Sequence, residues 1–255
     1  MTVPGSAPDE LAWQPTLDGD ARPAVPDLSF AGLVRHQLDE RSWIEVVPGW
    51  LHHHDELFEE LRREPRWQQR ERRMYERTVL EPRLVAAWRG DDLAALPLRV
   101  EQARAVLSAR YRVDLDSVLV NLYRDGQDAV AWHGDTVRRS LPLAVVCTVS
   151  LGHRRRFRVR PRGGGQVVLE LTPGEGDLVV MGGRMQHDWE HTVPREQVVG
   201  GARMSITLRH SRPVGGGSAR LPEPDDGYRE GRDEPPGAHD DHHPREAGPQ
   251  LRPDP

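Results

Sequence analysis

The sequence has no lysine, a single cysteine and no long apolar run, and the last two features each exclude a class of protein. With one cysteine, Cys147, the chain cannot form an internal disulfide framework, and the apolar run 143–149 around it predicts a buried side chain. No apolar run approaches the roughly 18 residues that a membrane-spanning helix needs. The N-terminus also lacks the basic and apolar regions of a secretion signal. We therefore expect a cytoplasmic protein with no membrane partner.

Because lysine is absent, all 35 basic residues are arginine, which indicates a bias in coding composition and weakens any argument from one arginine. The charge is unevenly distributed. Residues 1–60 hold 3 Arg against 12 acidic residues, residues 61–212 hold 27 against 18, and residues 213–255 hold 5 against 10. A basic middle between acidic flanks suits a polyanion such as nucleic acid, although a solvated charged surface explains it equally well.

The length of 255 residues predicts one sizeable domain with flexible ends. The hydrophobic fraction of 36% is low and the chain holds 24 Gly and 22 Pro, so part of it should carry no packed structure. We expect a loose arm over 1–28, the domain over 29–212 and a disordered acidic tail over 213–255. Three tail histidines offer a weak alternative, a metal-chelating tail: His239, His242 and His243.

Hydrophobic periodicity predicts an α+β chain in which helices come first and short strands follow. Helical spacing indicates helices over 55–63 and 98–110. The period then changes to two, and Gly-rich turns separate the candidate strands. These are 118–123, 131–135, 143–151, 157–160, 167–171, 178–181 and 203–209. Many short strands of this kind favour a sandwich or jelly-roll core over about 118–209.

A pair of metal-ligand side chains occurs in His133-Gly-Asp135. On a strand, residues two apart point to the same face, so the imidazole and the carboxylate can converge. His191 follows in Trp189-Glu-His191, near the end of another strand-like stretch, and would complete the two-histidine, one-carboxylate set of non-haem iron oxygenases. His187 competes for that role, and the Trp-x-His context favours His191. An isolated His-x-Asp pair is more often structural or fortuitous.

Alternating polar residues in segment 203–209 predict a site for a dicarboxylate. Arg203, Ser205, Thr207 and Arg209 share one strand face, where Arg203 can grip a carboxylate in bidentate fashion while Ser205 donates a hydrogen bond. The bland alternative is an edge strand with a solvated outer face. Two further polar residues, Asn121 and Tyr123, share a face of the strand before the His-x-Asp pair and can bind the same anion. As an isolated pair they would more often be structural.

Over about residues 81–210 the sequence resembles the AlkB-type 2-oxoglutarate-dependent dealkylases. The resemblance is carried by Asn121-Leu-Tyr123, His133-Gly-Asp135, 176–183, 188–194 and Arg-x-Ser-x-Thr-x-Arg at 203–209. It implies a double-stranded β-helix (jelly-roll) core with N-terminal helices packed on it. It also implies that Fe(II) is bound by His133, Asp135 and His191, and 2-oxoglutarate by Asn121, Tyr123, Arg203, Ser205 and Arg209. The family usually has Asn in place of Ser205.

The activity that this resemblance implies is oxidative dealkylation of N-alkylated bases in DNA or RNA, with O2 and 2-oxoglutarate as co-substrates. Such an enzyme needs a single strand or a flipped base. We expect a monomer. Segment 81–90 resembles the family's nucleotide-recognition lid, which makes Arg83 and Trp88 candidate substrate contacts, although the lid has Arg89 and then 91–96 where tyrosines are often found. Val137 also replaces an acidic residue that often follows the His-x-Asp pair.

Alternating arginines offer a second candidate substrate surface. If residues 154–162 form a regular strand, one face carries five guanidinium groups that can follow a phosphate backbone, those of Arg154, Arg156, Arg158, Arg160 and Arg162. A solvated outer strand in an arginine-biased protein is nearly as good an account. Two other functions stay open: an oxygenase of the same fold acting on protein or a small molecule, and a non-catalytic jelly-roll module that holds zinc or no metal.

Overall fold

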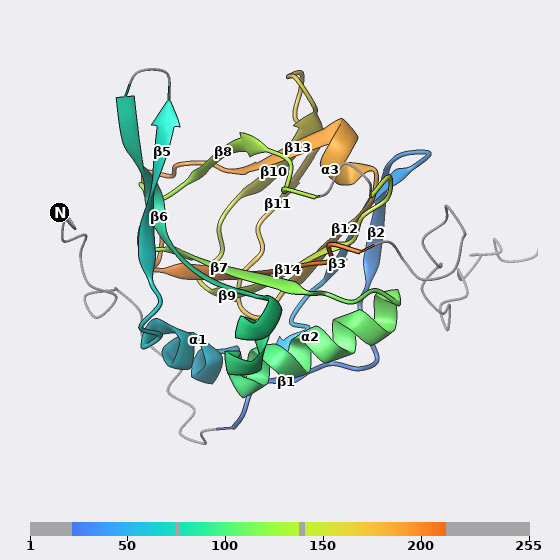
Figure 1. Ribbon diagram of the computed structural model, residues 1–255. Coiled ribbons are helices and arrows are strands. Elements are labelled where there is room, and N and C mark those ends of the chain that lie inside the picture. The colour runs from blue at the N-terminus through green and yellow to red at the C-terminus, as the bar shows by residue number, and fades with distance from the viewer. Residues whose placement is uncertain (1–21, 75–76, 138–140, 213–255) are drawn as a thin grey trace, which may run out of the picture. The chain divides into compact units, whose positions relative to one another are not determined.

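The structure is a computed structural model, and it describes residues 22–74, 77–137 and 141–212. Its strands form three sheets in which all pairings are antiparallel. The larger sheet has the order β2-β3-β12-β9-β14-β7-β6-β5, and the smaller has the order β11-β10-β13-β8. Figure 1 shows the smaller sheet stacked over the larger one. The third sheet pairs β1 (Val25–Pro26) with β4 (Leu51–His52).

Eight consecutive strands, β7 to β14, form the central part of the two stacked layers. In the larger sheet are β7 (Ser117–Tyr123), β9 (Val146–Gly152), β12 (Leu178–Gly183) and β14 (Arg203–Arg209). In the smaller are β8 (Val130–His133), β10 (Phe157–Pro161), β11 (Leu169–Leu171) and β13 (Trp189–Val193). The chain moves between the layers in the manner of a jelly roll. The predicted mostly-β core over about 118–209 is therefore confirmed as an antiparallel α+β architecture.

The expectation of helices alone before residue 117 is wrong. Four earlier strands extend the larger sheet at its two edges, namely β2 (Val34–Asp39), β3 (Ser42–Val47), β5 (Gln68–Met74) and β6 (Arg77–Arg89). In β6 the side chains of Leu84, Ala86 and Trp88 lie in the apolar core, while Arg83 and Arg89 line a cavity on the other face. The continuous apolar run from 84 to 88 hid this alternation, because Val85 and Ala87 are apolar too.

The two predicted helices are present, as α1 (His54–Arg62) and α2 (Leu98–Tyr111). Figure 1 shows both beside the larger sheet, on the side away from the smaller one, and a short 3-10 turn, η2 (Gly90–Ala95), precedes α2. Leu57, Phe58 and Leu107 belong to the same buried cluster as side chains of the sheet. None of the helices in the described ranges is long and apolar enough to span a membrane.

The described residues test only part of the predicted domain boundaries. Ala24 is buried and β1 pairs with β4, so residues 24–26 of the expected arm are joined to the rest of the described chain. Residues 1–21 and 213–255 lie outside the described residues, and so do the three tail histidines. The arm, the acidic tail and the boundary at 212 stay predictions.

A buried carboxylate ties α2 to the edge of the larger sheet. Glu45 of β3 is almost fully buried; its Oε1 accepts from Arg35 Nη2 at 2.6 Å, and its Oε2 accepts from the Tyr111 hydroxyl at 2.7 Å. Burial and the Glu45 carboxylate raise the pKa of Tyr111, so the phenol stays protonated and donates.

Replacing Tyr111 by phenylalanine should therefore remove one donor from a buried charge and lower the free energy of unfolding by about 1.5–3 kcal/mol. Urea unfolding measures the change. The same substitution in a Glu45→Gln background should cost clearly less, since a neutral amide needs the donor less. Equal losses in the two backgrounds would mean that the hydroxyl acts through packing alone.

Candidate active site

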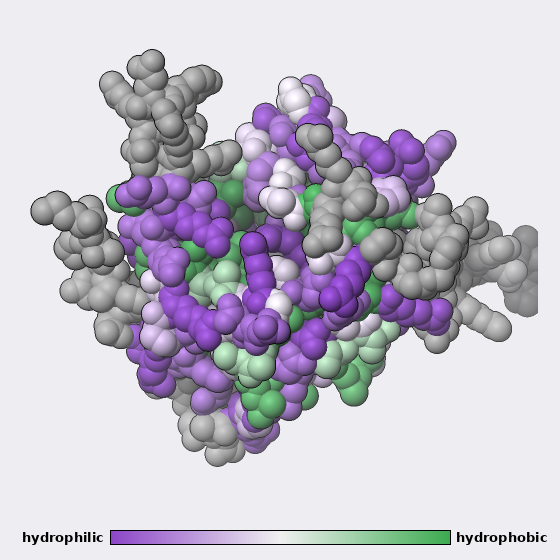
Figure 2. All heavy atoms as spheres, viewed as in Figure 1, coloured by the Kyte–Doolittle hydropathy of each residue, from purple (hydrophilic) through white to green (hydrophobic). Residues whose placement is uncertain are grey.

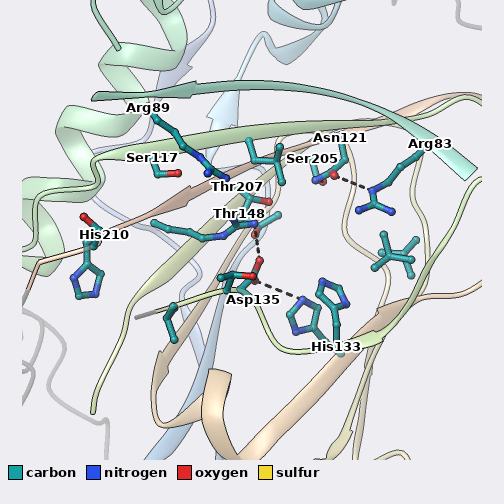
Figure 3. A pocket seen from close by; sticks show the side chains of 18 of the residues that line it. Arg83, Arg89, Ser117, Asn121, His133, Asp135, Thr148, Ser205, Thr207 and His210 are labelled. Atoms are coloured by element: carbon teal, nitrogen blue, oxygen red, sulfur yellow. Dashed lines mark hydrogen bonds and ion pairs between the residues drawn. The ribbon is translucent and has the colours of Figure 1, made fainter. Parts of the chain in front are cut away.

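Three predicted metal ligands meet between the two layers. His133 ends β8 and lies opposite His191 of β13 in the strand register, with ring centroids 4.4 Å apart. Asp135 follows two residues after His133, and its Oδ2 lies 3.6 Å from His191 Nε2. One donor atom from each of the three residues falls within 4.8 Å of the other two. Figure 3 shows His133 and Asp135 at the base of the cavity.

The protonation states of these groups suit a divalent cation. His133 Nδ1 lies 2.9 Å from the Ala131 carbonyl oxygen, which only accepts, so the proton sits on Nδ1 and Nε2 is free to bind a metal. Burial lowers the pKa of His191 to about 3, and that imidazole is neutral. Burial alone would raise the pKa of Asp135, but the Arg209 guanidinium brings it below its usual value. Two imidazoles and one carboxylate are the ligand set of non-haem Fe(II) sites.

The side chains of His133 and Asp135 converge for a different reason from the one predicted. A regular strand over 131–135 was expected, but β8 ends at His133 and Asp135 lies in the segment that follows. Its carboxylate is fixed instead by contacts from outside the strand. Oδ1 accepts from Arg209 Nη2 at 2.6 Å, and the backbone N–H donates to the side chain of Gln186 at 2.7 Å.

The polar strand expected over 203–209 is β14. It is not a solvated edge strand, which was the alternative interpretation. It lies between β7 and β9, with Ser205 opposite Asn121 on one side and Ser150 on the other. All of its residues are buried except the half-buried Arg209. Asn121 Nδ2 donates to Ser205 Oγ at 3.2 Å, and Asn121 Oδ1 accepts from Arg83 Nε at 3.0 Å, as Figure 3 shows for the second bond.

Arg203 is the strongest candidate anchor for a carboxylate. Its side chain is only 2% exposed, and Nη2 donates to Ser150 Oγ at 2.7 Å, while Nε and Nη1 have no partner among the described residues. Its guanidinium lies over the ring of Tyr123. Burial lowers the pKa of Arg203 from its usual value, and Tyr123 opposes that shift. A buried cation with two unused donors is costly unless an anion fills the site, and a carboxylate of 2-oxoglutarate has the matching geometry.

Comparison with known proteins agrees with this chemistry. The profile of the 2OG-Fe(II) oxygenase superfamily matches residues 44–209. The chain is a member of this superfamily, in its AlkB family. The chain therefore belongs to the iron- and 2-oxoglutarate-dependent dioxygenases, which argues against a non-catalytic module.

The curated relatives of this dioxygenase carry AlkB names. Alpha-ketoglutarate-dependent dioxygenase alkB homolog 3 of Bos taurus is 28% identical over 189 residues, 64% of this chain and 64% of the relative. The match thus spans just under two thirds of that relative's length. DNA oxidative demethylase ALKBH2 of Arabidopsis thaliana is 29% identical over 132 residues, 42% of each chain. The solved structure of OsALKBH1 aligns with a TM-score of 0.48 at 13% identity, over 69% of this chain and all of that one.

The active-site cavity of this dioxygenase has a volume of about 840 Å³, and sequence reasoning missed part of its wall. Thr148 of β9 was hidden in an apolar run, although its alternation with Ser150 in that run was a usable signal. Figure 3 shows Thr148 and Thr207 beside each other above the metal ligands. The other lining residues outside the predicted set include Arg70, Arg89, Asp116, Ser117, Thr136, Val137, His210 and Arg212.

The predicted substrate residues are mostly placed elsewhere. Trp88 is fully buried in the apolar core on the opposite face of β6, because the alternation of that strand points it away from the cavity. Arg83 does line the cavity, where it bonds Asn121 and Glu81. His187 is not a metal ligand in this geometry, since its Nε2 lies 2.8 Å from the Leu141 carbonyl oxygen.

The predicted row of arginines over 154–162 is not one strand face. Strand β10 begins only at Phe157, and none of these arginines is among the residues that line the cavity. Each one bonds a nearby acceptor. Arg154 pairs with Glu175 and Asp177, Arg156 with Glu196, Arg158 with Glu170 and Arg160 with Glu190, while Arg162 bonds the carbonyls of Gln186 and His187. Four of the five arginines of the expected phosphate track are therefore paired with carboxylates, and Arg162 is held by backbone carbonyls.

Removing the candidate anchor should separate co-substrate binding from metal binding. In Arg203→Met the dissociation constant for 2-oxoglutarate should rise roughly 10- to 100-fold, because a charge-assisted pair is lost. Titration calorimetry with Mn(II) bound measures it. The affinity for Mn(II) alone should stay at the wild-type value. A variant that binds 2-oxoglutarate as tightly as wild type would exclude Arg203 as the anchor.

Proposed function

We propose that this dioxygenase removes N-linked alkyl groups from bases of DNA or RNA held single-stranded or flipped out of a duplex. The names of its relatives support a nucleic-acid substrate, since one is called a DNA oxidative demethylase. The observation that carries the proposal is the charge of the cavity wall. Arg70 and Arg89 line the cavity and are exposed, and their side chains have no hydrogen bond or ion pair with any residue that the structure describes.

The other cavity arginines have defined partners or a defined task. Arg209 pairs with Asp135, Arg83 with Glu81 and Arg212 with Asp114, while buried Arg203 is reserved for the co-substrate. The surplus positive charge therefore lies at Arg70 and Arg89, on the strands β5 and β6 that border the cavity. Figure 3 shows Arg89 reaching from β6 into the cavity on the side of Thr207. Phosphate groups on either side of a bound base are the natural partners of such guanidinium groups.

In this proposal, different residues bind the metal and the co-substrate. His133, Asp135 and His191 would hold Fe(II), and Arg203 with Asn121 and Ser205 would orient 2-oxoglutarate beside it. When bound, this pair supplies the oxidation that converts O2, 2-oxoglutarate and the alkyl group to succinate, CO2 and a hydroxylated carbon. The hydroxylated N-alkyl group then breaks its C–N bond and leaves as an aldehyde. Figure 2 shows a largely hydrophilic face around the two sheets, which suits a polar, charged substrate.

One observation favours a second candidate, an oxygenase that acts on a protein or a small molecule. Trp88 cannot stack on a base from the core, and the row of arginines at 154–162 is already paired. An anionic peptide or metabolite could use Arg70 and Arg89 in the same way as a phosphate. The two functions differ in their products, so product analysis separates them.

Incubation with methylated single-stranded oligonucleotide, Fe(II), 2-oxoglutarate and O2 should release formaldehyde in step with succinate. Oligonucleotides with 1-methyladenine and 3-methylcytosine form the panel, and the Asp135→Ala variant, which lacks one metal ligand, should release none. Succinate formed without formaldehyde on either substrate would reject base dealkylation in favour of the second candidate.

Loss of one cavity guanidinium should weaken nucleic-acid binding through its charge. For Arg89→Ala we expect the slope of log K against log[salt] for single-stranded oligonucleotide to become shallower by about 0.7, which corresponds to one phosphate contact. Fluorescence anisotropy measures the slope. Arg195→Ala is the matched control, because Arg195 is exposed and lies outside the cavity, and its substitution removes the same charge. Equal slopes in the two variants would remove Arg89 from the binding site.

A further inference from the structure

The metal site contains a backbone group that the sheet leaves without a partner. The pairing of β8 with β13 ends at His133 opposite His191, and the register shifts between His191 and Val193. Asp135 is buried but lies beyond the last paired residue. A buried N–H without a partner is costly, so the amide of Asp135 needs an acceptor from outside the ladder.

Gln186 supplies that acceptor from α3 (Met185–Asp188). Its Oε1 accepts from the Asp135 N–H at 2.7 Å, and the side chain is only 3% exposed. The amide can be oriented in only one useful way. Its Nε2 lies 3.5 Å from Met181 Sδ, a weak acceptor, which leaves the oxygen for the stronger bond to Asp135.

The backbone between the two ligands also packs directly on α3. A Cβ atom on Gly134 would lie 2.6 Å from the Gln186 carbonyl oxygen and 2.4 Å from Arg162 Nη2, so only glycine allows this approach. Arg162 holds the helix at the same place, where Nη2 donates to the Gln186 carbonyl at 2.7 Å and Nε donates to the His187 carbonyl at 2.6 Å. The short helix is thus fixed against residue 134.

We propose that Gln186 is a positioning residue that sets the distance between the two halves of the metal site. Helix α3 leads directly into β13, which carries His191, while the Gln186 side chain holds the backbone of Asp135. Arg209 occupies Oδ1 of Asp135, and the backbone anchor then directs Oδ2 toward His191 Nε2. The role concerns the metal and holds whatever substrate the dioxygenase takes.

The test compares three variants by Mn(II) titration, followed by electron paramagnetic resonance of the free ion. Gln186→Leu keeps the volume and loses the acceptor, so its dissociation constant for Mn(II) should rise by roughly tenfold or more. Gln186→Glu keeps an acceptor oxygen and should restore an affinity close to that of wild type. Gln69→Leu is the matched control, since Gln69 donates to the Glu81 carbonyl at 3.0 Å in β5 and lies outside the cavity wall.

Thermal melts without metal separate positioning from folding. Without metal, Gln186→Leu should melt near the wild-type temperature. On adding Mn(II), its melting temperature should rise less than that of wild type. If it does not fold, Gln186→Asn replaces it, because the shorter amide keeps polarity but falls short of Asp135 and should also bind Mn(II) weakly. Wild-type affinity in Gln186→Leu, or in Gln186→Asn where that variant stands in, would overturn the proposal. So would a Gln186→Glu variant as weak as Gln186→Leu, which would assign the effect to packing of α3.

Discussion

A buried, ionised carboxylate is the constraint on which the site depends. Asp135 has to stay charged in a place where burial opposes charge, and it has to keep one oxygen available. Arg209 meets the first need by pairing with Oδ1, and the Gln186 contact to the backbone meets the second by limiting rotation of the segment. Neither partner is adjacent in sequence, so the metal site forms only once both sheets and α3 are in place.

Strand β14 connects this carboxylate to the far end of the cavity. Arg209 and Arg203 lie six residues apart on one face, which spans about 20 Å along an extended strand. Because β14 is held between β7 and β9, the backbone positions of both arginines are fixed by strand pairing. A rigid strand with a metal-side arginine at one end and a free buried arginine at the other is suited to present a diacid in a fixed direction.

Local patterns revealed the parts of the site that depend on local geometry. The polar alternation of 203–209 predicted the correct face of β14, and ligand type with spacing selected His133, Asp135 and His191. What failed depended on tertiary partners. Trp88 and Arg83 are on opposite faces of β6, but an apolar run does not reveal which face is covered. The support from Gln186 was equally invisible, because 51 residues separate it from Asp135.

The number of arginines says little about function in this chain. Whether each arginine has a carboxylate partner says more. The arginines over 154–162, which resembled a phosphate-binding row, pair with carboxylates from other parts of the chain, including Glu170, Glu190 and Glu196. Such pairing offsets the positive potential of these arginines. Arg70 and Arg89 have no such compensation and lie on the wall of the cavity. Among these arginines, the positive charge that no carboxylate offsets therefore lies mainly on the cavity wall rather than on the flank of the smaller sheet.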